Sequence, residues 1–294
     1  MRPETFARRM RALVAGKWRI VDLGTAVTEL KSGRIPPYTV VVTIDDGWRS
    51  TYALAGPVLA DLSIPATLYV TTYYTDRPAD VFNVVVHYLI WKTARRHVRL
   101  ETGHACLDGE YDLSAKPHAV AIRWIASANQ QLTWAERQKA LESIATSLGF
   151  DPADVLRDER FRIMSSEEIT RASSRGLDVQ LHTHRHTLPD ASEAEMRTEV
   201  EENKEIVERL KGTECRHFCY PSGLHSARQP EWLAAMGLAS STTCDIGMNG
   251  PETHPHRLRR ILDRETWSTL EFEAAMCGVF REPRVPSSSR GLEG

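Results

Sequence analysis

Short apolar runs alternate with amphipathic stretches along most of the chain. Residues 39–43 and 66–71 are rich in β-branched and aromatic side chains, which is typical of buried parallel strands. Between them, residues 51–62 carry leucine and valine on one face, as an amphipathic helix does. Repeated strand–helix units of this kind predict a parallel sheet covered by helices. Further strands are expected at 177–181, 216–220, 238–242 and 260–262, and further helices at 165–174, 193–211, 229–236 and 269–279.

Residues 72–161 interrupt this alternation. They show helical patterns at 84–95, 117–128 and 134–148 but no clear strand. We interpret about 73–161 as a helical insertion within one barrel domain that spans residues 1–282, and not as a separate domain. Residues 283–294 are rich in proline, serine and glycine, and this composition predicts a disordered tail.

Length and charge fit a single α/β barrel domain. The chain has 294 residues, and such barrels need about 250. A net charge of −2 gives no reason to expect nucleic-acid binding. No run of about 18 apolar residues is present, so no transmembrane segment is expected. The oligomeric state is left open.

The N-terminus and the cysteines predict a cytoplasmic location. The first ten residues include arginines, but the apolar stretch of a signal peptide does not follow them. The cysteine count of 5 is odd, and no Cys-x-x-Cys pair occurs. An odd count in a chain of this length favours reduced thiols and therefore a reducing compartment.

Two short segments carry the residues best suited to chemistry. Segment 43–47, Thr-Ile-Asp-Asp-Gly, ends one predicted strand, and segment 182–186, His-Thr-His-Arg-His, follows another. In parallel α/β folds the carboxyl ends of the strands form the binding site, so both segments are expected at one mouth. Two imidazoles and one carboxylate can hold a divalent metal ion. The second carboxylate is then free to take a proton during hydrolysis.

Each segment alone has an ordinary interpretation. Asp-Asp-Gly is most often a solvated turn, and two histidines four residues apart often lie exposed on a helix. Their occurrence together at strand ends favours a metal site, because the ligands must converge there. A third segment, 220–223, also ends a strand. Its Pro-x-Gly turn can aim backbone N–H groups at a developing oxyanion, although an ordinary β-turn has the same pattern.

Residues 6–280, apart from the insertion, resemble the polysaccharide deacetylases of carbohydrate esterase family 4, which share the NodB homology domain. Segment 43–47 resembles the first family motif, Thr-Phe-Asp-Asp-Gly, and segment 182–186 is similar to the second, His-Ser/Thr-x-x-His. Segment 220–223, Tyr-Pro-Ser-Gly, resembles the end of the third motif. Residues 57–59 and 64–70 also resemble the stretch that follows the first motif in this family.

The resemblance implies a distorted (β/α) barrel of about seven parallel strands. It implies that Asp46, His182 and His186 bind a divalent ion, with Zn²⁺ favoured and Co²⁺, Ni²⁺ or Mn²⁺ as alternatives. Asp45 would be the general base toward water. The implied reaction is hydrolysis of an N-acetyl group on an amino sugar or glycan precursor, so a carbohydrate is the expected substrate.

The third segment is the implied substrate-binding part of the site. The backbone N–H of Ser222 would help the metal to stabilise the tetrahedral intermediate. Tyr220, Pro221 and Gly223 belong to the same turn and are expected to line the substrate site with it.

The chain departs from the family pattern in ways that affect the proton transfers. Cys219 stands where relatives have an arginine that orients the catalytic aspartate. We expect Arg260, or its neighbour Arg259, to supply this charge, and we select Arg260. The motif with the general-acid histidine is absent, and we select His256 in its place. The alternatives are His184, His225 and His254.

The chain also lacks a strand that relatives carry upstream of the region like Phe6. Either the start is shorter than in the relatives or the barrel is open there. Without a signal peptide, a nucleotide-linked or lipid-linked sugar, or a surface-glycan precursor, is a better expectation than an insoluble polymer.

Two other functions are compatible with the same residues. One is the hydrolysis of a cyclic amide or ureide, which some relatives perform. The other is a barrel that binds metal or glycan without catalysis, which the missing arginine and acid suggest. The presence of both Asp45 and Asp46 argues against a pure binder, since such a protein has no use for a base.

Overall fold

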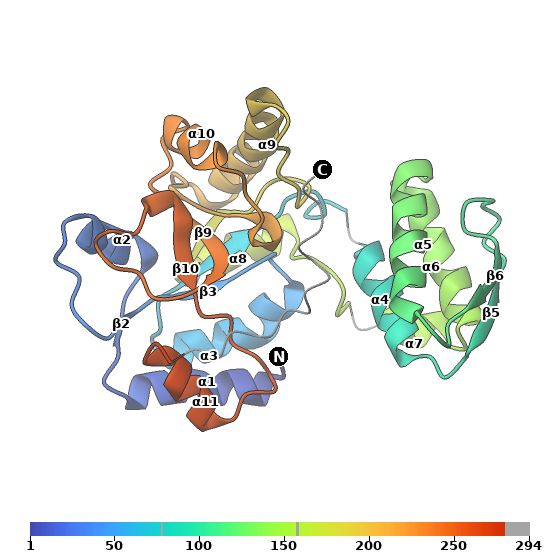
Figure 1. The fold of residues 1–294 in the computed structure, drawn as a ribbon, viewed down its shortest axis with the longest axis horizontal. Helices are drawn as coiled ribbons and strands as arrows, with labels where there is room; N and C mark the ends of the chain where they lie inside the picture. The colour runs from blue at the N-terminus through green and yellow to red at the C-terminus, as the bar shows by residue number, and fades with distance from the viewer. Residues whose placement is uncertain (78, 157–158, 280–294) are drawn as a thin grey trace.

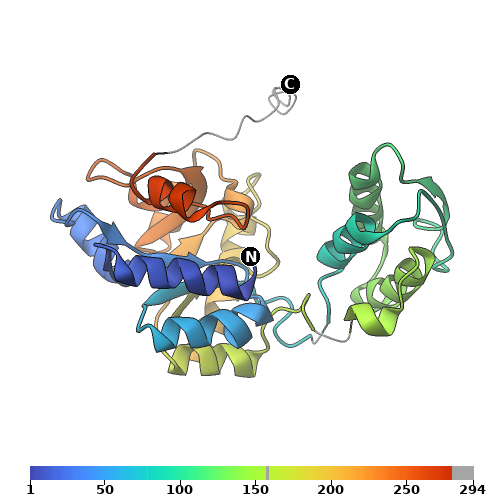
Figure 2. The ribbon, with the colours of Figure 1, turned by 90° about the horizontal axis from the view of Figure 1, so that it is seen from below.

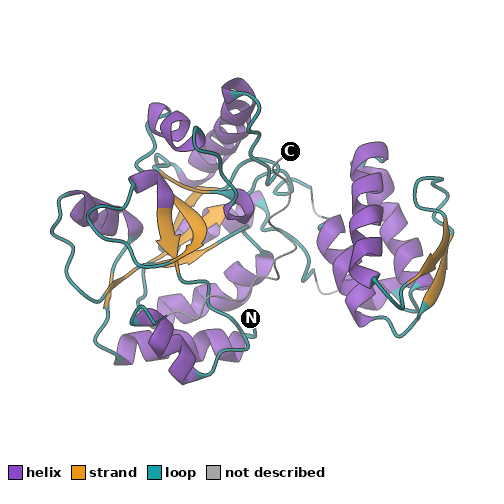
Figure 3. Cartoon of the chain, viewed as in Figure 1, coloured by secondary structure: helices purple, strands orange, loops and turns teal. Residues whose placement is uncertain are grey.

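The computed structural model describes residues 1–77, 79–156 and 159–279. The tail predicted at 283–294 lies outside the described residues. The described chain forms a lobe with a central sheet surrounded by helices, and a second, mainly helical lobe beside it (Figures 1 and 3). The second lobe is inserted into the first between residues that both belong to the sheet lobe.

Six parallel strands form the central sheet, in the order β10-β9-β8-β7-β4-β3. They are β3 (Val42–Ile44), β4 (Ala66–Val70), β7 (Leu177–Leu181), β8 (His217–Cys219), β9 (Ser240–Ile246) and β10 (Leu258–Arg260). A separate parallel pair consists of β1 (Arg19–Ile20) and β2 (Thr39–Val40). The predicted distorted (β/α) barrel is confirmed, although its main sheet has six strands where about seven were expected.

The two edge strands of this sheet, β3 and β10, are not paired with each other in the described chain. A side chain bridges them instead. Arg260 of β10 donates to the Thr43 hydroxyl of β3 over 3.4 Å and to the Asp45 carboxylate over 2.7 Å. We call the gap between β3 and β10 the seam. An open barrel was one of the two expectations from the sequence, and the seam agrees with it.

Helices pack on the sheet and on both sides of the seam. Those that follow strands are η1 (Thr51–Ala55), α3 (Gly56–Asp61), α8 (Ser166–Ser174), α9 (Glu193–Lys211) and α10 (Gln229–Ala235). Helices α1 (Pro3–Ala15), α2 (Leu23–Lys31) and α11 (Thr269–Met276) complete the lobe. α1 and α11 lie side by side (Figures 1 and 2), with the Arg9 guanidinium 4.6 Å from the centre of the Phe272 ring.

The strands alternate between two hydrophobic clusters, as the two-residue period of a strand requires. The larger cluster packs residues such as Val70, Leu181 and Phe218 against the surrounding helices. The smaller cluster joins Tyr69 and Cys219, on the other face of the sheet, to α2. The first face therefore belongs to the helix-covered outside, and the second faces the inside of the barrel.

The inserted lobe has its own hydrophobic cluster. Its elements are α4 (Phe82–Lys92), β5 (His97–Leu100), β6 (Gly109–Asp112), α5 (Pro117–Gln131), α6 (Trp134–Ser147) and α7 (Pro152–Leu156). The expectation of no strand here is wrong, because β5 and β6 form an antiparallel pair. Only Val98 and Leu100 of β5 are buried, and the exposed Arg99 lies between them, so the strand pattern is too short to stand out. No helix in the described ranges has the length and apolar character needed to cross a bilayer.

Candidate metal centre

The turn after β3 places two carboxylates at the mouth of the barrel. Asp46 and Gly47 both have positive φ angles, of 72° and 79°, so the chain turns sharply where the strand ends. A Cβ atom at position 47 would lie 3.0 Å from the Val70 side chain of β4, so glycine is needed for space as well as for its backbone freedom. A non-glycine residue such as Asp46 seldom adopts this conformation, and functional sites are where such residues concentrate.

The segment after β7 brings two histidines to Asp46. Thr183 and His186 have positive φ angles, of 63° and 58°, so the segment curls and does not continue as a helix. The Nε2 atoms of His182 and His186 lie 3.1 Å and 3.3 Å from Asp46 Oδ1. One ligand atom from each of the three residues lies within 4.8 Å of the others. The residues that the family resemblance assigns to a metal ion therefore converge.

Contacts on the far side of each ligand fix its orientation. The indole Nε1–H of Trp48 donates to Asp46 Oδ2 over 2.8 Å. The Nδ1 atom of His182 lies 2.7 Å from the Cys219 carbonyl oxygen. A carbonyl can only accept, so Nδ1 carries the proton and Nε2 presents its lone pair toward Asp46. The backbone N–H of His182 donates to Asn203 of α9 over 2.9 Å. Partners of this kind are what orient metal ligands in proteins.

The charges at this group suit a divalent cation. Burial raises the pKa of the Asp46 carboxyl, but the neighbouring imidazoles of His182 and His186 outweigh burial and hold this pKa well below its usual range. One ionised carboxylate and two imidazoles are the donors that zinc and related ions accept. His182 is buried, whereas the His186 side chain is 42% exposed, so this side of the group is open to solvent. The residues present fit a metal ion.

Asp45 lies next to this group and is held by an ion pair. Its carboxylate accepts two hydrogen bonds from Arg260, of 2.7 Å and 2.8 Å. The Arg260 Nε atom also donates to the Thr243 carbonyl over 2.7 Å, which fixes the guanidinium across the seam. Burial lowers the pKa of Arg260, but the hydrogen bonds to Asp45 and the nearby negative charge raise it by more. The pKa of Arg260 therefore lies above its ordinary value. The structure thus joins the predicted base to the predicted arginine, and their catalytic roles stay predictions.

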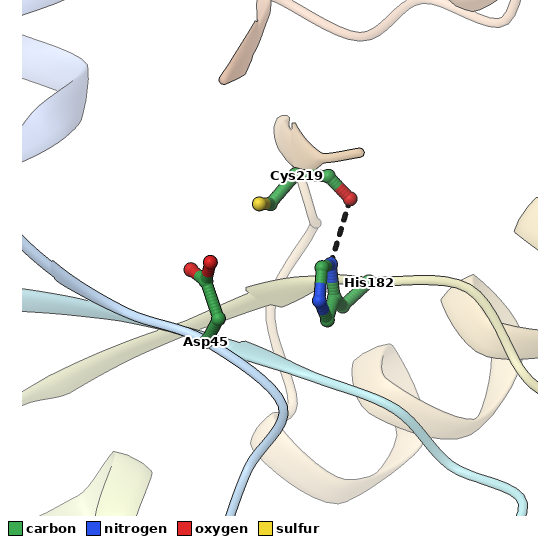
Figure 4. Close-up of side chains that lie close together, drawn as sticks. All are labelled: Asp45, His182 and Cys219. Carbon is green, nitrogen blue, oxygen red and sulfur yellow. Dashed lines mark hydrogen bonds between the residues drawn. The ribbon is translucent and has the colours of Figure 1, made fainter. Parts of the chain in front are cut away.

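Asp45, His182 and Cys219 form a second set of close ligand atoms (Figure 4). This set suits a metal less well than the first. Arg260 already occupies the Asp45 carboxylate, and the His182 ring uses Nδ1 to bind the Cys219 carbonyl, as Figure 4 shows. Burial raises the pKa of the Cys219 thiol well above its ordinary value, so the thiolate that would bind a metal is disfavoured. We therefore place the candidate metal site at the first set.

The third segment, 220–223, turns at the end of β8 as expected, but only some of its residues face the mouth of the barrel. Tyr220 and Pro221 are buried, and the Tyr220 hydroxyl donates to the His256 carbonyl over 3.0 Å. Ser222 is exposed and has a φ of 57°, and Gly223 has a φ of 72°. A Cβ atom at position 223 would collide with Cys244. Of the predicted substrate-binding residues, the structure thus leaves Ser222 and Gly223 at the mouth and turns the Tyr220 side chain into the core.

The structure does not bring His256 to the metal group. It lies in η3 (Pro255–Arg257), ahead of β10, whereas Arg260 lies at the far end of that strand. Its Nδ1 atom is 2.9 Å from the Ser241 hydroxyl, and burial lowers its pKa to about 4. A buried, neutral imidazole on the outer face of the sheet is badly placed to protonate a leaving group. The geometry therefore gives no support to our selection of His256 as the general acid.

The other histidines considered as acids are also engaged elsewhere. His184 pairs with Thr72, His225 stacks on Tyr220, and His254 accepts the His256 backbone N–H. Within the described ranges, no contact joins any of them to Asp45 or Asp46.

Sequence reasoning missed two residues that support the ligands. Trp48 directly follows the first segment, so its position was a signal that went unused. Asn203 shares the buried stripe of α9 with Met196, Val200 and Val207. A polar residue on an apolar stripe must satisfy its hydrogen bonds inside the protein, and this rule marks Asn203 in the sequence.

The comparisons with known proteins agree with the motifs. Residues 125–241 match the family model described as polysaccharide deacetylase. The matched stretch contains His182, His186 and segment 220–223, and it begins after Asp45 and Asp46. None of the curated proteins compared matches this chain. The family resemblance predicted from the motifs is thereby confirmed.

Solved structures share the fold at low sequence identity. The Streptococcus pyogenes deacetylase PplD, described in complex with acetate, has a TM-score of 0.61 at 16% identity, over 93% of this chain and 86% of PplD. IcaB from Ammonifex degensii has a TM-score of 0.57 at 20% identity, over 90% of this chain and 85% of IcaB. The deacetylase domain of BpsB from Bordetella bronchiseptica has a TM-score of 0.51 at 15% identity, over 86% and 82%.

Proposed function

We propose that this chain, as a relative of the polysaccharide deacetylases, is a metal-dependent hydrolase that removes an N-acetyl group from an amino sugar or glycan precursor. The observation that carries the proposal is the convergence of Asp46, His182 and His186 beside a second carboxylate, Asp45, which Arg260 holds at two points. The family match and the shared fold support the same class of reaction.

The residues divide the work of amide hydrolysis. When bound at Asp46, His182 and His186, a divalent ion supplies a Lewis acid for the acetamide carbonyl and makes water more acidic. Asp45 takes a proton from the attacking water, since its carboxylate lies at the same mouth and is not one of the three converging ligands. Arg260 orients that carboxylate. The Ser222 N–H, at the end of a neighbouring strand, is assigned to the developing oxyanion.

The proton for the leaving amine has no histidine donor in the described contacts. We assign it to Asp45, which gains a proton in the first step. As the C–N bond breaks, this proton passes to the amine nitrogen, acetate is released and Asp45 is ionised again. One carboxylate then serves as base and as acid in the same turnover.

The test is acetate release from a panel of N-acetyl sugars by protein loaded with Zn²⁺, Co²⁺, Ni²⁺ or Mn²⁺. Asp45→Asn is expected to keep its metal and lose activity by roughly 10²–10⁴-fold, the range for general acid–base catalysis. Asp46→Asn is expected to lose metal and activity together. The matched control is Asp245→Asn, because Asp245 is an exposed carboxylate one residue before the end of β9.

The panel also separates the other candidate functions. A cyclic amide or ureide would open without acetate, and a binding protein would give neither product. Full activity in Asp45→Asn would contradict the role of this base. A metal-free protein whose activity ignores chelators would contradict the proposal as a whole.

A further inference from the structure

A cavity of about 990 Å³ lies at the seam of the barrel. Its lining comes from β3 and β10 and from the N-terminal and C-terminal segments that flank them, including α1, α2 and α11. Most of the lining residues are apolar, and Trp18, Val27 and Phe272 are examples. Small-molecule pockets in proteins span about 300–1,000 Å³, so this cavity is at the large end of that range.

The cavity has an exposed apolar rim. Met1, Tyr38, Leu54 and Met248 line it, and their exposed fractions lie between 50% and 61%. A contiguous group of large, exposed apolar side chains usually marks a binding surface, whereas single scattered ones do not. The rim therefore admits an apolar ligand from solvent.

Charged residues also line the cavity, and they include the proposed catalytic pair. Asp45 and Arg260 line it, bonded to each other, and Asp263 pairs with Arg9. Arg259 also lines the cavity and is exposed. Within residues 1–77, 79–156 and 159–279, no ion pair or side-chain hydrogen bond engages its guanidinium. In that part of the chain, the lining therefore includes a guanidinium that has no partner.

We propose that the seam cavity binds the hydrocarbon chain of a lipid-linked, phosphate-bearing N-acetyl sugar, an inference that rests on the proposed function for its reaction. The chain would lie among the apolar lining residues, Arg259 would bind the phosphate, and the acetamide would reach Asp45.

The chemistry of the lining favours a hydrocarbon over other occupants. A sugar ring would lose the water on its hydroxyls without hydrogen-bond partners in return. A peptide segment would bring backbone N–H and C=O groups that the apolar walls cannot satisfy. A hydrocarbon chain has neither cost, and each methylene that leaves water strengthens binding by about fourfold.

Direct binding tests the site without catalysis. Alkyl phosphates of increasing chain length, kept below their micelle concentration, are titrated by calorimetry. The dissociation constant is expected to fall about fourfold per added methylene until the cavity is filled. Leu54→Asp at the rim should raise the dissociation constant of dodecyl phosphate by at least about tenfold. Leu270→Asp is the matched control, because Leu270 is 75% exposed and lies outside the lining, and it should leave binding unchanged.

Two further variants protect the test against misfolding. Ala26→Trp on α2 fills the cavity from one wall and should shorten the longest chain that still gains affinity. Arg259→Gln should weaken the binding of dodecyl phosphate but leave the binding of dodecanol unchanged. If both variants bind dodecyl phosphate as the original protein does, the site is overturned.

Activity then links the cavity to the reaction. The dodecyl ester of N-acetylglucosamine 1-phosphate should have a KM at least about tenfold below that of the methyl ester, and Leu54→Asp should abolish the difference. Equal KM values with acetate release and no alkyl phosphate binding would overturn this inference and leave the proposed function standing. Alkyl phosphate binding without acetate release from either ester would support the hydrocarbon site and contradict the proposed function. A dimer in sedimentation that Leu54→Asp dissociates, with no alkyl phosphate bound, would assign the rim to a second copy of the chain and overturn the inference.

Discussion

Arg260 supplies the guanidinium that the family resemblance places at position 219. Its Nη2 atom lies 3.3 Å from the Cys219 sulfur and 2.8 Å from Asp45 Oδ2. A small thiol at 219 therefore leaves room for an arginine that arrives from another strand. The guanidinium thus lies beside position 219, where the resemblance implies an arginine.

Arg260→Lys is expected to lower kcat by roughly 10–100-fold while the metal content stays the same. An ammonium is a point charge and cannot hold both oxygens of Asp45 in one plane. Steady-state kinetics and metal analysis of the purified variant check this. Arg257→Lys, a short distance away and exposed, is the control and should change neither. Equal kcat in the two variants would show that the two-point contact does not matter.

Trp48→Phe is expected to lower metal affinity by about 10–100-fold, the usual effect of losing a partner behind a ligand. The indole N–H that holds Asp46 Oδ2 is lost, and the aromatic ring is kept. Competition with a coloured chelator measures the affinity. Trp91→Phe, on the exposed surface of the inserted lobe, should bind metal as the original protein does. A Trp48→Phe protein with unchanged affinity would contradict the supporting role.

At the scale of single residues, the sequence predicted which side chains form the candidate metal site, but it did not predict the position of His256. Asp46, His182 and His186 carry motif spacing that points to one mouth, and the structure brings them together. His256 carries no such spacing, so its selection rested on residue type alone. Which face of the sheet it occupies depends on how η3 enters β10, and a local pattern does not contain that information.

His256 shows how an element sets the chemistry of a residue. It lies in η3, just before β10, where its Nδ1 atom pairs with the Ser241 hydroxyl and its backbone carbonyl accepts from the Tyr220 hydroxyl. His256→Asn is therefore expected to keep kcat within a few-fold, whereas loss of a general acid would cost roughly 10²–10⁴-fold. Acetate release at neutral pH decides between the two. A loss of that larger size with the fold intact would restore His256 as the acid.

Buried histidines also predict how stability depends on pH. Burial lowers the pKa of both His217 and His256 from 6.5 to about 4. The unfolded chain takes up protons near pH 6.5 and the folded chain does not, so the stabilising contribution is present above pH 6.5. It is lost as pH falls from 6.5 toward 4, by about 1.4 kcal/mol per pH unit for each histidine.

Chemical denaturation between pH 7 and pH 4.5 measures this slope. The free energy of unfolding should fall less steeply in His256→Asn than in the original protein, because one of the two groups is gone. His118→Asn is the control, since His118 is exposed, and it should leave the slope unchanged. Identical slopes in all three proteins would contradict the assignment.

Helices were easier to predict than short strands. The capping box of Ser165 and Glu168 starts α8 where the sequence placed it, and Gly212 ends α9 with a φ of 73°. The apolar run at 39–43 was predicted as one strand, but it divides into β2 and β3 at Val41, because the run pairs with two different partners. Partner choice is a tertiary property, and local propensity does not specify it.

In the described residues, the barrel and the inserted lobe share no hydrophobic cluster: two clusters lie in the barrel and a third lies in the inserted lobe. We therefore expect two unfolding transitions. Leu68→Ala and Leu141→Ala form a matched pair, each 1% exposed, in the barrel and the lobe respectively. Each should destabilise its own transition by about 2–5 kcal/mol. Calorimetry checks this, and a chelator should shift the barrel transition alone. One transition that both variants shift equally would show that the lobes fold together.

The six-stranded sheet with a seam is the part of the architecture that the sequence left undecided. Whether a strand lies at the edge of a sheet depends on its neighbours in space. β3 and β10 are separated by most of the chain, so local sequence patterns do not show whether they pair. The family resemblance predicted a barrel, and only the arrangement of the strands distinguishes a closed one from an open one.

The seam makes Asp45 part of the barrel's mechanical closure as well as of its proposed chemistry. Elsewhere the sheet is held by ladders of backbone hydrogen bonds, whereas across the seam the described hydrogen bonds all come from Arg260. When Asp45 accepts a proton in the proposed reaction, its ion pair with Arg260 loses one charge, so the contact across the seam weakens until the proton leaves. The two edge strands would then separate transiently during each turnover. Backbone amide hydrogens along β3 and β10 would exchange with solvent faster during catalysis than in the enzyme without substrate.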